Sequence, residues 1–350
     1  MEKVIAFIKQ YKWILLLSIA GIAIIIFFVI ALITFTNTSK QQVINTPQIE
    51  ETNNAKVIEE EIIEAKVLPK KDFLNNTSIV SYLDNLEYVD GEDGLDLATY
   101  KITDGKINLT TKTTDPEFTL EANNTAEHNF LWDYFYTIFG EINTTKYINN
   151  FIINTDGIDG SLASMYLNDD NVWGLYVDPA DTLEKGKFFD LQDFTYTLVH
   201  EFGHLITLNS SQVDYNNYDE YTCETILLSE GCLYDKAYSF IYFQKFWGGG
   251  LYEDWETIVG YDAYEEDVTY FYEEYTENFI TEYAATDTDE DIAESFAHFV
   301  LTDKPTANAI KNQKILFFYE YPELVNIRNI IRKNITSIDP VFFSKPLNIQ

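Results

Sequence analysis

The sequence predicts an α+β fold, in which a small sheet packs on one amphipathic helix and a helical C-terminal part follows, behind an N-terminal transmembrane helix. Three observations lead to this prediction. Residues 161–167 and 172–177 alternate polar and apolar side chains as strands do, and residues 169–171 fit a turn between them. Residues 191–208 have the apolar spacing of a helix packed on a core. Residues 13–35 carry no charge.

The uncharged segment 13–35 is long enough to cross a membrane. Its 23 residues would extend about 34 Å as a helix, and a bilayer core is about 30 Å thick. Three lysines precede it within residues 1–12, so the positive-inside rule places the N-terminus in the cytoplasm. The alternative is a cleaved signal peptide, but its apolar region is normally shorter and no small-residue cleavage site follows. The sequence therefore predicts an uncleaved single-pass anchor in the cell membrane, with the main domain extracellular.

The rest of the chain divides by composition into a stalk or linker over residues 36–72, a small region over 73–125 and a larger domain over 126–350. Of the 350 residues, 46% are hydrophobic, which is enough for a sizeable core. The net charge of -34 argues against nucleic acid as a partner, because phosphate binding requires clustered lysine and arginine. The same acidity favours cationic substrates.

Two further segments read as helices. Residues 128–139 are rich in aromatic side chains and predict a buried helix. Residues 322–334 predict a packing helix with proline in its first turn. Residues 98–102 resemble a strand that ends at a turn over residues 104–105.

The chain contains two cysteines, Cys223 and Cys232. In a reducing cytosol they would be free thiols, whereas in an oxidising compartment their spacing allows a disulfide that closes a small loop. Because the segment 13–35 predicts export, we expect the disulfide.

The sequence His-Glu-Phe-Gly-His at residues 200–204 is the main chemical feature of the chain. His200 and His204 are four residues apart, so both imidazoles lie on one helix face and can bind one metal ion. Glu201 projects about 100° around the helix, where it can deprotonate a metal-bound water. Two imidazoles and one carboxylate suit a single Zn²⁺ ion and leave a fourth position for water. The alternative is a helix with two buried, hydrogen-bonded histidines.

A third metal ligand must come from another part of the chain. Positions 207 and 210 are Thr207 and Ser210, which excludes a third histidine at the short spacing. Glu290 and Glu294 share one face of a predicted helix, and two buried carboxylates are costly unless they bind something. We expect Glu290 to bind the metal and Glu294 to accept the outer ring N–H of His200. Exchanged roles, or two solvated surface acids, remain alternatives.

These two motifs together resemble a known family. The chain combines HEFGH with a second motif made of Tyr283, Thr286, Glu290, Ala293, Glu294 and Phe296. This combination is similar to the gluzincin zinc metallopeptidases of the anthrax lethal factor and Pro-Pro endopeptidase group. The resemblance implies a zincin-like domain in which His200, His204 and Glu290 bind zinc. It also implies that Glu201 is the general base and that Tyr283 stabilises the oxyanion.

The expected function is therefore that of a membrane-anchored, exported zinc endopeptidase acting on a peptide or protein substrate. In zinc proteases an edge strand near this chain position often pairs with the extended substrate, so we expect residues 172–177 to do so. The alternatives are a non-catalytic surface binding protein with a zincin fold and a zinc hydrolase acting on cell-wall linkages.

Overall fold

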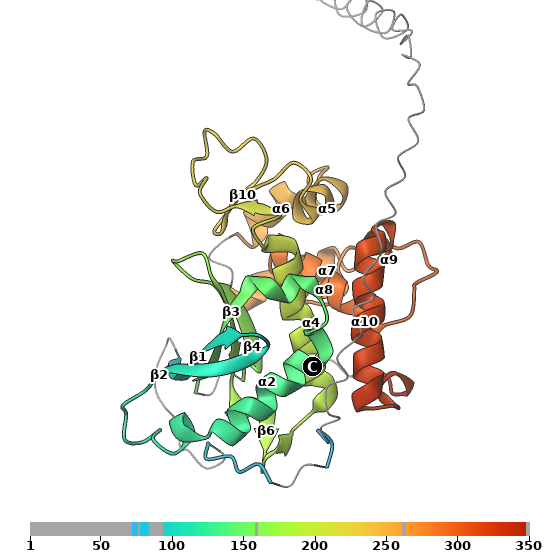
Figure 1. Cartoon of the computed structure of the whole chain (residues 1–350). Coiled ribbons are helices and arrows are strands. Elements are labelled where there is room, and N and C mark those ends of the chain that lie inside the picture. Colours follow the sequence, from blue (N-terminus) through green and yellow to red (C-terminus); the bar gives the residue numbers. More distant parts are fainter. Residues whose placement is uncertain (1–71, 76–77, 84–93, 158–159, 261–263, 348–350) are drawn as a thin grey trace, which may run out of the picture. The chain divides into compact units, whose positions relative to one another are not determined.

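The computed structural model describes residues 72–75, 78–83, 94–157, 160–260 and 264–347. All of them belong to one compact unit of the chain. The fold of this unit is α+β: a five-stranded sheet packs against a helix from the middle of the chain, and a helix nearer the end of the chain packs on that helix in turn (Figure 1). This class agrees with the α+β expectation.

The five strands of the main sheet have the order β2-β1-β3-β5-β4. They are β1 (Leu95–Thr103), β2 (Lys106–Lys112), β3 (Ile148–Thr155), β4 (Ala163–Leu167) and β5 (Trp173–Val177). Strands β1 and β2 form a hairpin whose turn, Asp104 and Gly105, has positive φ at both residues. Strand β3 runs parallel to β5, and β4 pairs with β5 in antiparallel fashion.

The predicted pair of strands before the histidine helix is confirmed, but the prediction of which one lies at the edge is wrong. Strand β5 lies between β3 and β4, so β4 is the edge strand. The burial patterns give the reason. In β5 four of five residues are buried, as in a strand flanked on both sides, whereas β4 alternates and leaves Tyr166 60% exposed.

The described helices of more than one turn follow these strands or separate them. They are α2 (Thr125–Phe139), α4 (Leu191–Leu208), α5 (Tyr238–Phe246), α6 (Leu251–Ile258), α7 (Glu265–Glu274), α8 (Thr288–Leu301), α9 (Ile310–Phe317) and α10 (Pro322–Ile338). Shorter elements include α3 (Pro179–Thr182), β6 (Leu183–Glu184), β7 (Lys187–Phe188), β8 (Val213–Asp214), β9 (Leu227–Leu228), β10 (Gly231–Leu233) and the 3-10 helix η3 (Tyr283–Ala285). The helices predicted over 128–139 and 322–334 are confirmed as α2 and α10.

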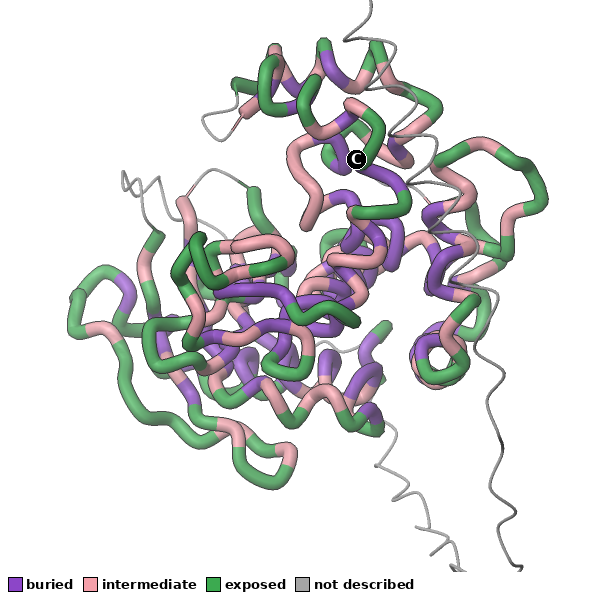
Figure 2. Tube along the Cα trace, turned by 90° about the horizontal axis from the view of Figure 1, so that it is seen from above, coloured by how far each residue is buried: buried purple, intermediate pink, exposed green. Residues whose placement is uncertain are grey.

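Helix α4 is the central element and contacts both the edge strand β4 and helix α8 (Figure 1). It begins at Asp190, whose carboxylate accepts the backbone N–H groups of Gln192 and Asp193 at 2.8 and 3.2 Å. Its apolar face is packed by aromatic side chains of α2: the rings of Phe139 and Phe202 have centroids 4.6 Å apart. Figure 2 shows how the buried residues follow the central helices and strands, while the outer loops are exposed.

The boundary predicted between residues 125 and 126 does not separate two folding units. Strand β1 precedes this boundary and β3 follows it, yet the two pair along residues 95–101 in one sheet. The hairpin β1–β2 thus extends the sheet of the larger domain.

The predicted fold requires one correction. Among the described residues, the longest helix is α4 with 18 residues, and no helix is long and apolar enough to cross a membrane. The predicted anchor, residues 13–35, lies outside the described residues, together with residues 1–12 and nearly all of the predicted stalk. The described fold is therefore α+β, and no described helix supports the predicted location in the cell membrane.

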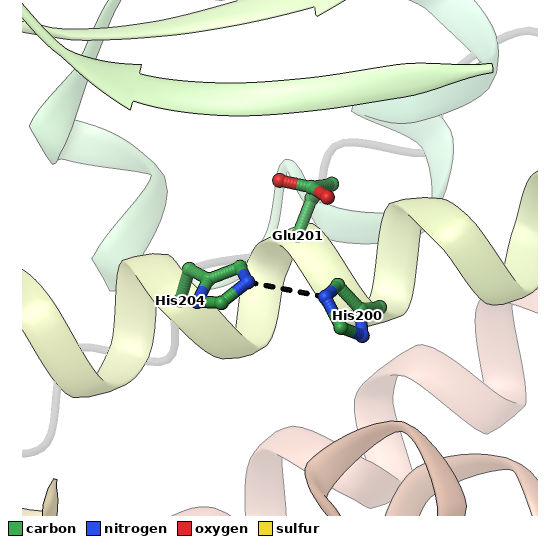
Figure 3. A group of neighbouring side chains, drawn as sticks. All are labelled: His200, Glu201 and His204. Atoms are coloured by element: carbon green, nitrogen blue, oxygen red, sulfur yellow. Dashed lines mark hydrogen bonds between the residues drawn. The ribbon is translucent and has the colours of Figure 1, made fainter. Parts of the chain in front are cut away.

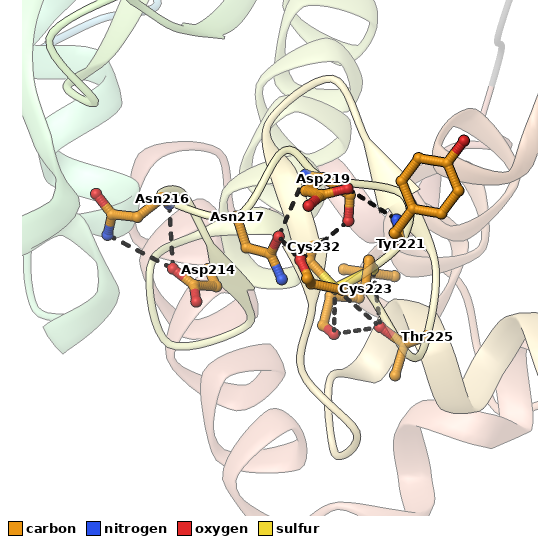
Figure 4. Close-up of a disulfide and its surroundings, with 10 residues drawn as sticks. Asp214, Asn216, Asn217, Asp219, Tyr221, Cys223, Thr225 and Cys232 are labelled. Carbon is orange, nitrogen blue, oxygen red and sulfur yellow. Dashed lines mark hydrogen bonds between the residues drawn. A yellow bond between two sulfur atoms is a disulfide. The ribbon is translucent and has the colours of Figure 1, made fainter.

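Between α4 and α5 the chain forms a small three-stranded sheet of order β8-β10-β9, where Cys223 and Cys232 form a disulfide (Figure 4). The bond connects residues nine positions apart. It therefore ties the loop around Asp219 to strand β10, on which Cys232 lies.

Replacing both cysteines by serine is expected to destabilise the protein. Closing a loop of this length restricts the unfolded chain, which corresponds to about 2–3 kcal/mol of folding free energy. Urea unfolding of the double variant and of the wild type, under oxidising conditions, measures the difference. Equal unfolding free energies would contradict a structural role for the bond.

Candidate metal centre

The centre forms where helices α4 and α8 pack closely together. Helix α4 carries His200, Glu201 and His204, and α8 carries Glu290 and Glu294. At the crossing of the two helices, a Cβ added to Gly203 would lie 3.2 Å from the Cα of Ala293. Glycine at position 203 thus allows the backbones to approach, which brings the polar faces of the two helices together.

Three atoms of the kind that can bind a metal converge at this crossing. The Nε2 atom of His200 is 3.1 Å from the Nε2 of His204 and 2.9 Å from the Oε2 of Glu290 (Figure 3 shows the two histidines). The Nε2 of His204 is 3.4 Å from the same carboxylate oxygen. Ligands bound at about 2.1 Å to one tetrahedral zinc ion lie about 3.4 Å from one another. The three atoms therefore have nearly the spacing that a single ion imposes.

The donor chemistry fits a metal ion as well. The Nδ1 of His200 lies 2.8 Å from the Oε1 of Glu294. Because a carboxylate accepts, Nδ1 carries a hydrogen; when the ring is neutral, its Nε2 presents a lone pair to its neighbours. The Oε2 of Glu290 is buried and has no partner with hydrogen-bond geometry. In that state lone pairs face one another, and the His200–Glu201–His204 group can hold a metal ion.

The pKa values of His200 and Glu290 also show that a positive charge is stabilised at this place. Burial opposes protonation of His200, but the close carboxylates of Glu290 and Glu294 outweigh burial and raise its pKa to about 10. Burial also opposes ionisation of Glu290, yet the histidines hold the pKa of its carboxyl well below the usual range. A proton shared by these residues therefore does electrostatically what a cation would do. A metal ion must displace that proton, so metal affinity falls as the pH is lowered.

Glu201 lies beside the ligand atoms and points away from them toward the sheet (Figure 3). Its Oε2 accepts the backbone N–H of Met165 on strand β4 at 2.6 Å. Burial raises the pKa of Glu201, against the attraction of the two nearby imidazoles. One carboxylate oxygen of Glu201 lies within 4.8 Å of both imidazoles, but Glu290 is closer at 2.9 and 3.4 Å. The assignment of Glu290 as third ligand stays a prediction, which these distances support over Glu201.

Glu294 is fixed by hydrogen bonds on both of its oxygens. Its Oε1 faces His200, and its Oε2 accepts the hydroxyls of Tyr196 at 2.7 Å and Thr281 at 2.6 Å. Burial opposes ionisation, but these partners, His200 first among them, lower the pKa of Glu294. The arrangement matches the outer role expected for Glu294. Sequence reasoning missed Tyr196 and Thr281; the position of Tyr196, four residues before His200, was the available signal.

The Tyr196→Phe variant is expected to bind metal about tenfold more weakly, because loss of one donor loosens the carboxylate that orients His200. Tyr134→Phe is a matched control. The buried hydroxyl of Tyr134 is 2.6 Å from the Oγ1 of Thr195, the residue before Tyr196 on α4, and it makes no described hydrogen bond to Glu294. Competition with a chromogenic chelator measures both affinities. Equal affinities in the two variants would show that Tyr196 does not act on the metal centre.

Tyr283 lies at the open side of the centre. Its ring centroid is 5.8 Å from that of His200, and the residue is 54% exposed. Burial of the hydroxyl and the charges of Glu290 and Glu201 raise its pKa, so the phenol stays protonated and can donate a hydrogen bond.

A cavity of about 970 Å³ adjoins the centre and is lined by His200, Glu201 and Tyr283. Its other walls come from the start of β4, from α7 and from the first turns of α4. Val268 belongs to the wall that α7 contributes.

No protein-family profile, curated protein or solved structure matches this chain. The fold and the site thus define an α+β protein with a buried His200–Glu201–His204 group that can hold a metal ion. The resemblance to gluzincins rests on the two sequence motifs and stays a prediction.

Proposed function

We propose that the protein is a zinc-dependent endopeptidase that hydrolyses peptide bonds in peptide or protein substrates. The observation that carries the proposal is the convergence of His200, His204 and Glu290, with Glu201 directly beside them. Two imidazoles and one carboxylate form a ligand set typical of catalytic zinc, with one position left for water or substrate. A purely structural site has no need of Glu201 as a base.

When bound, zinc would supply a Lewis acid that lowers the pKa of water and polarises the scissile carbonyl. Glu201 takes a proton from the attacking water and delivers it to the leaving amine. Its raised pKa suits this task, because the group must both accept and release the proton. Tyr283 donates a hydrogen bond to the oxygen on which negative charge develops. Glu294 keeps the ring of His200 in position throughout.

Strand β4 offers a place for the peptide backbone of the substrate. It lies at the sheet edge, and Leu162 and Ala163 at its start line the cavity. An extended peptide can pair with such an edge as an additional strand. The Met165 N–H is held by Glu201, which keeps the base aligned with that edge.

The proposal is tested with the purified protein. Elemental analysis should find one zinc per chain, and a peptide library should be cleaved, with loss of cleavage on chelation and recovery on addition of Zn²⁺. A zinc-loaded protein that cleaves no peptide would overturn the proposal and leave a binding role.

A further inference from the structure

We propose that the cavity beside the metal centre binds a lysine or arginine side chain of the substrate, with Asp193 as the group that pairs with its charge. This inference rests on the proposed peptidase function and names the class of side chain that the site selects.

The cavity extends along α4 away from the histidines. Both His200 and Asp193 line it. Asp193 precedes His200 by seven residues on the same helix, which corresponds to about 10 Å along the helix axis. A substrate side chain that enters beside the metal centre must therefore be long to reach Asp193.

The cavity that His200 and Asp193 line has partly apolar walls. Leu162 and Ala163 contribute from the start of β4, Val268 contributes from α7, and Tyr196 contributes from α4. Lysine and arginine combine an apolar stem with a charged head, so the stem can pack on these walls while the head reaches the far end.

The far end carries the carboxylate of Asp193, and further acidic side chains line the cavity. Asp193, Glu265 and Glu282 line the cavity, whereas no lysine or arginine is among its described lining residues. Asp190 already caps α4, and no hydrogen bond to the Asp193 carboxylate is found in the described part of the chain. Burial and the nearby Asp190 raise the pKa of Asp193, so its carboxylate gains from a cationic neighbour.

Other side chains fit this cavity less well. A glutamate would meet like charge at the far end. A methionine is long enough to pack along the apolar walls. It would, however, cover the half-buried carboxylate of Asp193 without pairing with it, which costs free energy. The cavity therefore discriminates by charge among side chains of similar length.

The test measures binding separately from cleavage. The best-cleaved library peptide is resynthesised with lysine, methionine or glutamate at each position flanking the scissile bond. Anisotropy of labelled peptides gives their affinities for the zinc-loaded Glu201→Gln protein, and kcat/KM is measured with the wild type. We expect lysine at one flanking position to bind about tenfold or more tightly than methionine, with glutamate weakest.

Asp193→Asn, introduced into both proteins, should remove most of this lysine preference, chiefly through affinity and KM. Asp193→Lys should reverse it toward glutamate. Glu253→Gln is the matched control, because it removes one exposed acid from the first turn of α6, outside the cavity, and should keep the preference. Peptide cleavage without a lysine preference, or a preference that survives Asp193→Asn, would overturn the inference and leave the peptidase function standing. Absence of all cleavage would instead overturn the proposed function, and with it the premise of this inference.

Discussion

Glu201→Gln is expected to keep the metal and lower kcat/KM by about 100- to 10,000-fold, the range attributed to general acid–base catalysis. Glutamine has nearly the same shape and can still accept the Met165 N–H, so the local structure should be retained. Its amide cannot take a proton from water. The variant therefore separates metal binding from proton transfer.

Two measurements accompany this variant. Zinc content should match that of the wild type, which shows that the loss concerns proton transfer alone. In the wild type, activity should fall as the pH drops below the raised pKa of Glu201, because the protonated carboxyl cannot act as a base. Equal cleavage by the variant and the wild type would remove Glu201 from the mechanism.

The parts of the site that depend on local sequence could be predicted. The four-residue spacing of His200 and His204 determines that they share a helix face, and the Asp190 cap marks where that helix begins. Glu290 and Glu294 were selected by the same helical periodicity on a second helix. Their distance from the histidines depends on packing at Gly203, whose close contact with Ala293 no local pattern reveals.

The features that sequence reasoning missed depend on pairing between distant segments. Strand β5 was expected at the edge from its place in the chain order alone, but β3 pairs with it from the other side. The hydroxyl of Thr281 reaches Glu294 through a loop whose path the sequence does not specify. The predicted membrane anchor, residues 13–35, lies outside the described residues, and no described helix is long and apolar enough to cross a membrane.

Lys314→Met is expected to lower the free energy of unfolding by about 3–5 kcal/mol, the cost of leaving a buried charge without its partner. The Nζ of Lys314 lies 2.6 Å from the Oδ2 of Asp291, and both side chains are fully buried. The same oxygen accepts the Nε1–H of Trp247 at 2.8 Å. Burial raises the pKa of Asp291 and lowers that of Lys314, in spite of their mutual attraction. Denaturant unfolding measures the loss.

The double variant Lys314→Met, Asp291→Asn distinguishes the effect of an unpaired charge from the effect on the position of α8. Asparagine still accepts from Trp247 and removes the unpaired charge, so most of the stability should return; a double variant as unstable as the single one would contradict the ion-pair explanation. Asp291 directly follows Glu290 on α8, and Lys314 lies on α9. The pair therefore connects the start of α8 to a neighbouring helix at the residue next to the expected third ligand. If the Lys314–Asp291 pair fixes the position of Glu290, the double variant should regain stability but not zinc affinity. Chelator competition should then give a zinc affinity below that of the wild type.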